Sequence, residues 1–389
     1  MKQIFILFIS FLYTIIAYTQ EETKPAFQFT TTKEIPITTV KNQASSGTCW
    51  SFSSIGLIEA ELLRQGKGTH DLSEMYLVRK SYEDKAKKYV RMAGTINFAG
   101  GGSCADILAG IQQYGIVPDA VQPGLNYGEP LHRHGELDML LKAYVGAVIK
   151  NPNKKLSTAW YEGFSGILDA YLGKCPETFD YNGTQYTPQG FAQSLGIRPG
   201  DYVSLTSFTH HPFYTSFPIE IPDNWQWSYS YNLPLDELMQ VIDRAIEKGY
   251  TVAWATDVSE KGFSRKGIAI VPDTEAAESA GSDQARWTGA KEDPVSSLSA
   301  PLPEKQITQE MRQEAFDNYE TTDDHGMLIY GTAQDQNGTK YYLVKNSWGT
   351  KVAYDGIWYA SVPYVRYKTI NIVVHKDVLS KELTKKIGL

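Results

Sequence analysis

The sequence predicts an α+β protein with a helical first part and an antiparallel sheet in its last part. Before residue 119, apolar residues recur at the three- and four-residue spacing of amphipathic helices; after Tyr250 they form short, partly β-branched runs typical of strands. With 389 residues, 42% of them hydrophobic, the chain can bury a sizeable core in two or three domains, or in one domain with a large insertion. Segregated helical and strand patterns of this kind are typical of the α+β class.

The charge balance and the cysteine count narrow the functional classes. There are 37 Lys and Arg residues against 44 Asp and Glu residues, a net charge of −7 without a basic tract, so nucleic acid is not an expected partner. Three cysteines are too few for a disulfide scaffold, and their odd number leaves at least one without a partner in the chain. Cys104 and Cys175 could pair in an oxidising compartment, but two unpaired buried thiols are the favoured interpretation.

The N-terminus has the pattern of an export signal. Lys2 precedes an apolar run from Ile4 to Ala17, which is short for a bilayer span but has the length of a signal-peptide core. Small residues at the end of this run predict cleavage before Gln20, so residues 1–19 are the predicted signal peptide and the mature protein is expected to be periplasmic or secreted. An uncleaved anchor is the alternative. No later segment has the pattern of a membrane span, so no stable membrane anchor is expected.

Helical elements are predicted directly after a polar arm at residues 20–34. In the helical half, residues 35–118, a turn-rich stretch ends at Thr48 and a helix follows from Cys49 to about Gly66. Cys49 is therefore expected at a helix N-terminus. Two further helices are predicted, one after the cap-like sequence Asp71-Leu72-Ser73-Glu74 and one at Cys104–Tyr114.

The rest of the chain divides into an insertion, a β-rich half and a tail. The insertion, residues 119–245, is rich in Tyr and Pro, and amphipathic segments are expected at 137–148, 161–172 and 235–248. In the β-rich half, residues 246–374, strand patterns fall at 251–256, 267–271, 325–332, 341–347, 356–361 and 369–374, with a polar loop at 272–306 and a helical pattern at 308–319. Asn337-Gly338 is typical of a hairpin turn. The tail, residues 375–389, shows no further core pattern.

Cys49 is the candidate nucleophile. A thiol attacks as thiolate, and a helix N-terminus lowers its pKa. A lone cysteine is more often buried and inert, but a nucleophilic cysteine also needs a base and a group that orients the base. His325 opens one apolar strand and Asn346 closes the next. Because a hairpin at Asn337-Gly338 places the start of one strand beside the end of the other, these two side chains are expected to meet.

Gln43 and Trp348 complete this constellation. The amide of Gln43 and the backbone N–H of Cys49 could together stabilise an oxyanion, for which losing one donor typically costs about 10²–10³ in turnover. Trp348 could cover the hydrogen bond between His325 and Asn346 and keep water away from it. Each residue also has an ordinary explanation, such as a surface position for a lone Gln and a turn for an Asn.

Three sequence blocks resemble the active-site blocks of papain-like cysteine peptidases, in the same order. They are Gln43 with Gly47-Thr48-Cys49-Trp50-Ser51-Phe52-Ser53, then His325-Gly326-Met327, then Lys345-Asn346-Ser347-Trp348-Gly349. Here the histidine follows the cysteine by 276 residues, far more than the roughly 130–150 residues of papain relatives. This enlargement is similar to the bleomycin hydrolase and aminopeptidase C group, and the resemblance runs from about Val40 to Val374.

The resemblance implies a papain-like fold, peptide substrates, a Cys-His-Asn mechanism, and neither a cofactor nor a metal. It implies that Gly101 and Gly102 line the cleft and pair with the substrate backbone. Ala255–Asp257 is expected to border a specificity pocket, and Trp348 to contact substrate. Members of this group are cytosolic hexamers whose C-terminal carboxylate captures the substrate's N-terminus. The export leader and the ending Lys385-Lys386-Ile387-Gly388-Leu389 depart from that pattern.

We therefore expect a cysteine peptidase, and more specifically an aminopeptidase. An endopeptidase with the same active site is the first alternative, and a catalytically silent peptide-binding protein is the second.

Histidines outside this constellation have ordinary interpretations. His132 and His134 resemble a metal pair but have no third ligand nearby in the sequence, so we expect them in a loop and facing solvent. His210-His211 is also expected in a loop, where contact with substrate is an alternative.

Overall fold

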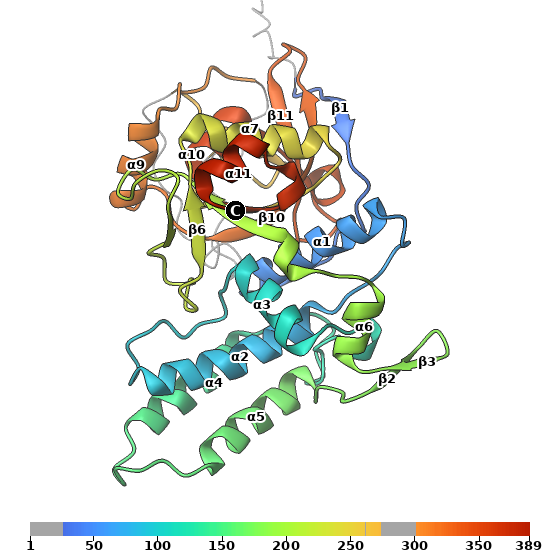
Figure 1. The fold of residues 1–389 in the computed structure, drawn as a ribbon, viewed down its shortest axis with the longest axis vertical. Coiled ribbons are helices and arrows are strands. Elements are labelled where there is room, and N and C mark those ends of the chain that lie inside the picture. The colour runs from blue at the N-terminus through green and yellow to red at the C-terminus, as the bar shows by residue number, and fades with distance from the viewer. Residues whose placement is uncertain (1–25, 261, 274–300) are drawn as a thin grey trace, which may run out of the picture.

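The computed structural model describes residues 26–260, 262–273 and 301–389. The predicted signal peptide, residues 1–19, and most of the polar loop predicted at 272–306 lie outside the described residues. Helices and a large sheet form an α+β arrangement, as predicted, with a group of helices standing apart from the sheet in the lower part of Figure 1. The insertion predicted at 119–245 does not stay apart, because it supplies three strands to the sheet; its boundaries remain a prediction.

Six helices of the N-terminal part enclose their own apolar core. They are α1 (Cys49–Arg64), α2 (Glu74–Arg91), α3 (Cys104–Tyr114), α4 (Gly135–Ile149), α5 (Ala159–Leu172) and α6 (Pro188–Ser194). The sequence signals for two starts and one stop are confirmed. The Ser73 hydroxyl accepts the N–H of Tyr76 at the start of α2, and α3 begins at Cys104 and stops before Gly115, which has a φ of +77°.

Within the described residues, the sheet has 11 strands, ten of them in the order β5-β6-β4-β13-β7-β10-β11-β12-β9-β8, with β1 paired to β10. The strands are β1 (Thr30–Glu34), β4 (Tyr202–Thr206), β5 (Ser216–Pro218), β6 (Tyr229–Asn232), β7 (Val252–Thr256), β8 (Phe263–Ser264), β9 (Ile268–Ala269), β10 (His325–Gln334), β11 (Lys340–Lys345), β12 (Ile357–Ser361) and β13 (Thr369–His375). Most pairs are antiparallel, as expected, but β4 with β6 and β9 with β12 are parallel, so the sheet is mixed.

The remaining elements are short or cover the sheet. Helices α7 (Leu235–Glu247), α9 (Gln309–Asp317), α10 (Val362–Lys368) and α11 (Lys381–Ile387) accompany the sheet, and β2 (Phe179–Tyr181) with β3 (Thr184–Tyr186) forms a separate hairpin. Short 3₁₀ turns are η1 (Asp119–Val121), η2 (Pro199–Asp201), η4 (Ala353–Gly356) and η5 (Lys376–Val378).

The predicted hairpin between β10 and β11 is confirmed and fixes the register of both strands. The Asp335 carboxylate accepts the N–H groups of Asn337 and Thr339, and Gly338 takes a φ of +80° that favours glycine. Leu328 pairs with Lys345. The hairpin therefore brings the first residue of β10 near the residue that follows β11.

The two faces of the sheet have different partners. Ala253, Leu328 and Val373 point to one face and pack with Leu57 of α1. Residues next to them in the strands, such as Trp254 and Ile329, point to the other face, where they share a core with α7, α10 and α11. Helix α1 thus lies between the helical part and the sheet.

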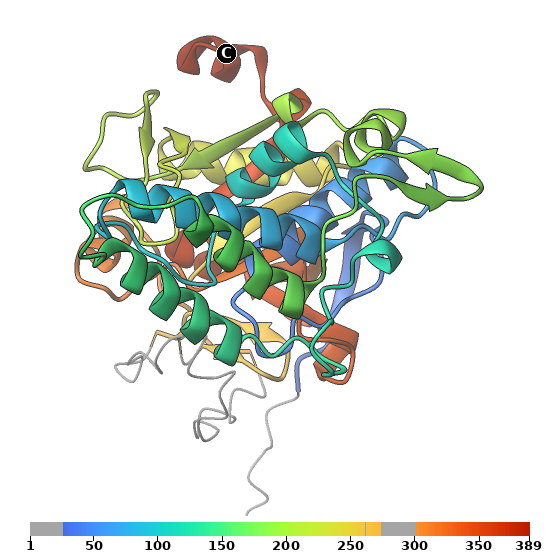
Figure 2. The same ribbon diagram turned by 90° about the horizontal axis from the view of Figure 1, so that it is seen from below.

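The C-terminal tail corrects one expectation, because it does contribute to the core. In α11, Leu383 and Ile387 are buried in the same cluster as α7, and Lys386 contacts Glu237 at 3.2 Å. Figure 2 shows this helix at the outer edge of the molecule. Two apolar residues on a seven-residue helix are too few to give a periodic signal, which is why the sequence pattern did not predict it.

Candidate active site

Cys49 is the first residue of α1, as predicted. The Thr48 carbonyl accepts the N–H groups of Ser51 at 2.8 Å and Phe52 at 3.3 Å and so begins the helix at this point. The Cys49 side chain lies at the positive end of a 16-residue helix, with 8% of its surface exposed. The sulfur therefore lies at the helix end whose first N–H groups have no partner within the helix.

His325 is the first residue of β10 and faces the same cavity as Cys49. The close approach of the two elements depends on Gly326, because a Cβ there would lie 3.2 Å from the Trp50 Cα and 2.8 Å from the Ser53 Oγ. Only a glycine lets the start of β10 pack directly on the first turn of α1. The packing therefore brings together two residues that are 276 positions apart in the chain.

Asn346 is hydrogen-bonded to the His325 imidazole, as expected from the hairpin between the two strands. Its Oδ1 lies 2.7 Å from the His325 Nε2 and also accepts the backbone N–H of Ser347 at 2.7 Å. Because the second bond identifies this atom as the amide oxygen, the His325 Nε2 must be the donor. His325 Nδ1 is then the ring nitrogen that Asn346 does not contact.

Trp348 covers this hydrogen bond. Its ring lies 5.1 Å from the His325 ring, centroid to centroid, and is itself packed against Phe263 and Trp358. The expected shielding of the pair from water agrees with this position. Trp348 is not among the described residues that line the cavity, so the expectation of substrate contact gains no support.

Gln43 is fully buried rather than at the surface. Its backbone N–H donates to the Ser347 carbonyl at 2.8 Å, its side-chain nitrogen donates to the Ser46 carbonyl at 2.8 Å, and its side-chain oxygen accepts the Ser347 hydroxyl. The loop before Cys49 is thereby attached to the segment that carries Asn346. The role of Gln43 as an oxyanion donor remains a prediction.

The cavity at this point has a volume of about 290 Å³, and Gly101 and Gly102 line it, as expected. Neither position can hold a side chain. A Cβ on Gly101 would lie 1.8 Å from the Asp223 Oδ2, and one on Gly102 would lie 2.7 Å from the Asp106 Oδ2 and 2.9 Å from the Trp50 ring. Their small size is thus required by the protein itself, and their pairing with a substrate backbone remains a prediction.

Sequence reasoning missed the acidic character of this cavity. Asp138, Asp223, Asp323 and Asp324 all line it. Lys85, whose charge acts on Asp138 and Asp223, donates to the carbonyls of Ala99 at 2.7 Å and of Gly101. Asp323 has no hydrogen-bond or ion-pair partner among the described residues. No motif marks Asp223, which the fold of the insertion brings to the cavity, and Asp323 is not among the site residues predicted from the sequence.

The electrostatics of two of these carboxylates are coupled. Burial, and next the neighbouring charge of Asp223, raises the pKa of Asp323 well above its usual range. Burial also raises the pKa of Asp223, although Lys85 and a hydrogen bond from Asn97 at 3.2 Å oppose this effect. A positively charged group beside these carboxylates would favour their charged forms.

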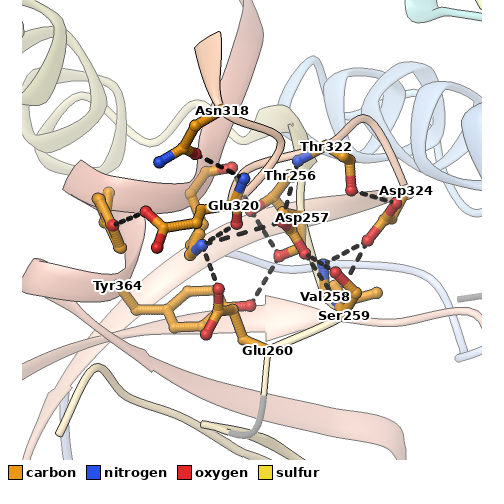
Figure 3. Close-up of polar contacts among 12 residues, drawn as sticks. Thr256, Asp257, Val258, Ser259, Glu260, Asn318, Glu320, Thr322, Asp324 and Tyr364 are labelled. Atoms are coloured by element: carbon orange, nitrogen blue, oxygen red, sulfur yellow. Dashed lines mark hydrogen bonds and ion pairs between the residues drawn. The ribbon is translucent and has the colours of Figure 1, made fainter. Parts of the chain in front are cut away.

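The Asp257 side chain is buried in a polar network and, contrary to expectation, is not among the described residues that line the cavity. It is fully buried, and its carboxylate accepts the N–H groups of Ser259 at 2.6 Å and Thr322 at 2.9 Å and lies 3.9 Å from the Lys368 ammonium (Figure 3). Asp324 accepts the Ser259 N–H at 3.1 Å in the same network. The network fixes the segment that leads into His325, while Ala255, two residues earlier, does line the cavity.

The three cysteines are unpaired, as favoured, but Cys104 and Cys175 are half-buried instead of fully buried. Cys104 lines the cavity at the start of α3, but burial raises the pKa of its thiol to about 12. Cys175 accepts a hydrogen bond from Arg79 at the far side of the helical core. Cys49 is thus the cysteine placed for catalysis.

The expectation for His132 and His134 was wrong. His134 is fully buried, and His132 packs edge-on against it with ring centroids 5.7 Å apart. Burial lowers the pKa of His132 to about 4 and that of His134 to about 3. The segment folds inwards because α4 begins at Gly135 and its first turn packs on the helical core, a tertiary effect that the polar sequence did not indicate.

Comparisons with known proteins agree with this geometry. Residues 25–117 match the model of the papain family cysteine proteases, and residues 303–388 match that of the peptidase C1-like family. Aminopeptidase C from Listeria monocytogenes is 23% identical over 390 residues, which cover 90% of this chain and 83% of that protein. Aminopeptidase C from Streptococcus thermophilus is 22% identical over 388 residues, covering 88% and 81%.

A solved structure shows the same fold. The crystal structure of PepW from Lactobacillus rhamnosis superposes with a TM-score of 0.68 at 22% identity, covering 92% of this chain and 84% of that one. The chain has a papain-like fold, and the two matched segments contain Cys49 and His325 with Asn346. The chain is a cysteine-type peptidase, and it is similar to the aminopeptidase C proteins of these two bacteria.

Proposed function

We propose that this chain is an aminopeptidase that removes residues from the free N-terminus of peptides by a Cys-His-Asn thiolate mechanism. The observation that carries the proposal is one cavity lined by a thiol at a helix N-terminus and by an imidazole bonded to Asn346 at 2.7 Å. The aminopeptidase names of its relatives support the exopeptidase part.

The proposed chemistry has three stages: attack on the carbonyl, departure of the amine and hydrolysis of the thioester. The Cys49 thiolate attacks the scissile carbonyl carbon and forms a C–S bond, while the oxyanion accepts hydrogen bonds from the Cys49 N–H and the Gln43 amide. The protonated imidazole of His325 donates its proton to the leaving amine as the C–N bond breaks. His325 then removes a proton from water, which hydrolyses the thioester and regenerates the thiolate.

Recognition of the substrate's N-terminus needs a negative group at the end of the cleft, and in this chain we assign it to side chains. None of the described residues that line the cavity comes from 375–389, and α11 packs on the face of the sheet opposite to α1. Asp223 and Asp323 line the cavity. Lys85 acts on Asp223, but no cation is among the groups that act on Asp323. An α-ammonium group between them would pair with both and lower their raised pKa values.

The nucleophile is tested by substitution and by labelling. Cys49→Ala should lower hydrolysis of an aminoacyl substrate by at least about 10³-fold, because the oxyanion donors cannot replace the nucleophile. A thiol-directed epoxide should label the wild-type protein at Cys49, and Cys104→Ala should be labelled equally. Full activity of Cys49→Ala, or labelling at Cys104 instead, would contradict the mechanism.

Export and assembly are further parts of the proposal. We propose that residues 1–19 direct the chain to the periplasm or the exterior, which N-terminal sequencing of the mature protein would test. Within the part of the chain that the structure describes, no helix has the length and apolar character needed to cross a membrane. A hexamer, which the resemblance implies, is tested by light scattering of the purified protein.

A further inference from the structure

A cluster of metal-ligating side chains lies outside the active site. His210 and His211 follow β4, and Glu220 follows β5. The His210 Nε2 lies 3.1 Å from one carboxylate oxygen of Glu220, and the His211 Nε2 lies 2.8 Å from the other. In the described part of the chain, this is the one group of three such residues whose ligand atoms all lie within 4.8 Å of one another.

We propose that His210, His211 and Glu220 bind a divalent transition-metal ion, for which Zn²⁺ is the best match. Two imidazole nitrogens and one carboxylate are ligands that zinc commonly takes in proteins. At metal–ligand distances of about 2.0–2.1 Å, tetrahedral geometry places ligand atoms about 3.3 Å apart. The two histidine–carboxylate separations, 3.1 and 2.8 Å, are close to that value, and all the ligand atoms lie within 4.8 Å of one another, so small shifts would admit the ion. A water molecule would complete the coordination of the exposed site.

The two rings are held in place by aromatic neighbours before any ion binds. The His211 ring stacks on Phe217 with centroids 4.0 Å apart, and the His210 ring lies parallel to Phe316 with centroids 5.8 Å apart. Little side-chain freedom is left to lose when a metal binds. This arrangement separates the cluster from flexible surface histidines.

Gln313 of α9 contacts the other ring nitrogen of His210. The Gln313 Nε2 lies 3.0 Å and its Oε1 3.3 Å from the His210 Nδ1. A metal on Nε2 needs the proton of His210 on Nδ1, and the Gln313 Oε1 would then be its acceptor. The amide is oriented by its own partners, because Oε1 accepts the Thr209 N–H at 2.5 Å and Nε2 donates to Asp317 at 2.9 Å.

The position of the site gives the ion a structural role next to the catalytic cavity. Ile219 and Ile221, on either side of Glu220, both line that cavity, and Asp223 follows two residues later. An ion would connect this segment to the loop after β4. It would thereby hold the cavity wall that carries Asp223, whether or not the chain is an aminopeptidase.

Titration calorimetry with ZnCl₂ on the full mature protein tests the site, in a Cys49→Ala background so that the catalytic thiol does not contribute. We expect one equivalent to bind, and His210→Ala, His211→Ala and Glu220→Gln each to weaken binding by more than about 100-fold. The matched control, His70→Ala, should bind as the parent does.

Thermal unfolding gives an independent readout that does not use activity. Zn²⁺ should raise the unfolding temperature of the parent and leave that of the three ligand variants unchanged. The metal-free unfolding temperatures show whether each variant is folded. Absence of binding in the parent, or equal binding after loss of all three ligands, would overturn the proposal and leave the cluster as a set of hydrogen bonds.

Discussion

The His325 side chain contacts Asn346 and Trp348, two residues that its sequence motif already pointed to. The Asn346 side-chain oxygen accepts a hydrogen bond from the His325 Nε2, and the Trp348 ring covers this bond. Both lie within three residues of each other in one block of sequence, so a linear motif was enough to identify them. Asp223 has no such block, because only the folding of the insertion places it against Gly101.

Asn346→Ala should lower kcat by roughly 10–100-fold, a part of the 10²–10⁴-fold that a positioned acid–base group contributes. The imidazole would lose its oriented tautomer while Cys49 stays intact. The pH profile of kcat/KM should change as well, which a purely structural effect would not cause. An unchanged kcat would contradict the orienting role.

Asp323→Asn should lower kcat/KM for peptides with a free N-terminus by about 10–100-fold, as expected for the loss of one partner of a part-buried charge pair. It should leave any residual cleavage of N-blocked peptides unchanged. Steady-state kinetics on matched peptides measures both. Asp180→Asn, at an exposed position of β2, is the control; an equal loss for both peptides would reject the proposed ammonium site.

At the scale of elements, the long helices and the central strands were predicted and the short tail helix was not. Helix α3 and the β10–β11 hairpin carry clear start, stop and turn signals in the sequence. Helix α11 has seven residues, and its two buried side chains are buried by tertiary contact with the core that contains α7, which a short sequence pattern does not indicate. The parallel pairs of the sheet are likewise set by the path of the insertion.

Leu383→Ala should destabilise the protein by about 2–5 kcal/mol, the usual cost of emptying a buried leucine site. The proposed selectivity of the enzyme for free N-termini should remain in this variant, because α11 lies outside the cavity. Chemical denaturation and the ratio of free to N-blocked cleavage measure the two effects separately. Loss of selectivity in the folded variant would instead favour capture by the C-terminal tail.

At the scale of the whole molecule, the buried histidines predict sensitivity to acid. His134 has a folded pKa of about 3 against an ordinary value of 6.5, so the unfolded chain binds a proton that the folded chain does not. Stability contributed by neutral His134 is therefore lost as the pH falls from about 6.5 towards 3. The sequence could not indicate this, because the segment is polar and its burial is tertiary.

His134→Asn should make the pH dependence of the unfolding free energy less steep in this window, by up to about 1.4 kcal/mol per pH unit. Urea denaturation at several pH values between 4 and 7 measures the slope. His70→Ala is the matched control. A slope identical to that of the wild type would show that His134 does not titrate as its burial requires.

The measurement that most directly tests the central claim is a comparison of two peptides that differ only in a free or acetylated N-terminus. If Asp223 and Asp323 bind the α-ammonium group, kcat/KM for the free peptide should exceed that for the blocked one by about 100-fold or more, with the first residue released. Cys49→Ala should abolish both reactions. Equal rates for the two peptides, or internal cleavage of the blocked one, would contradict the account and identify an endopeptidase.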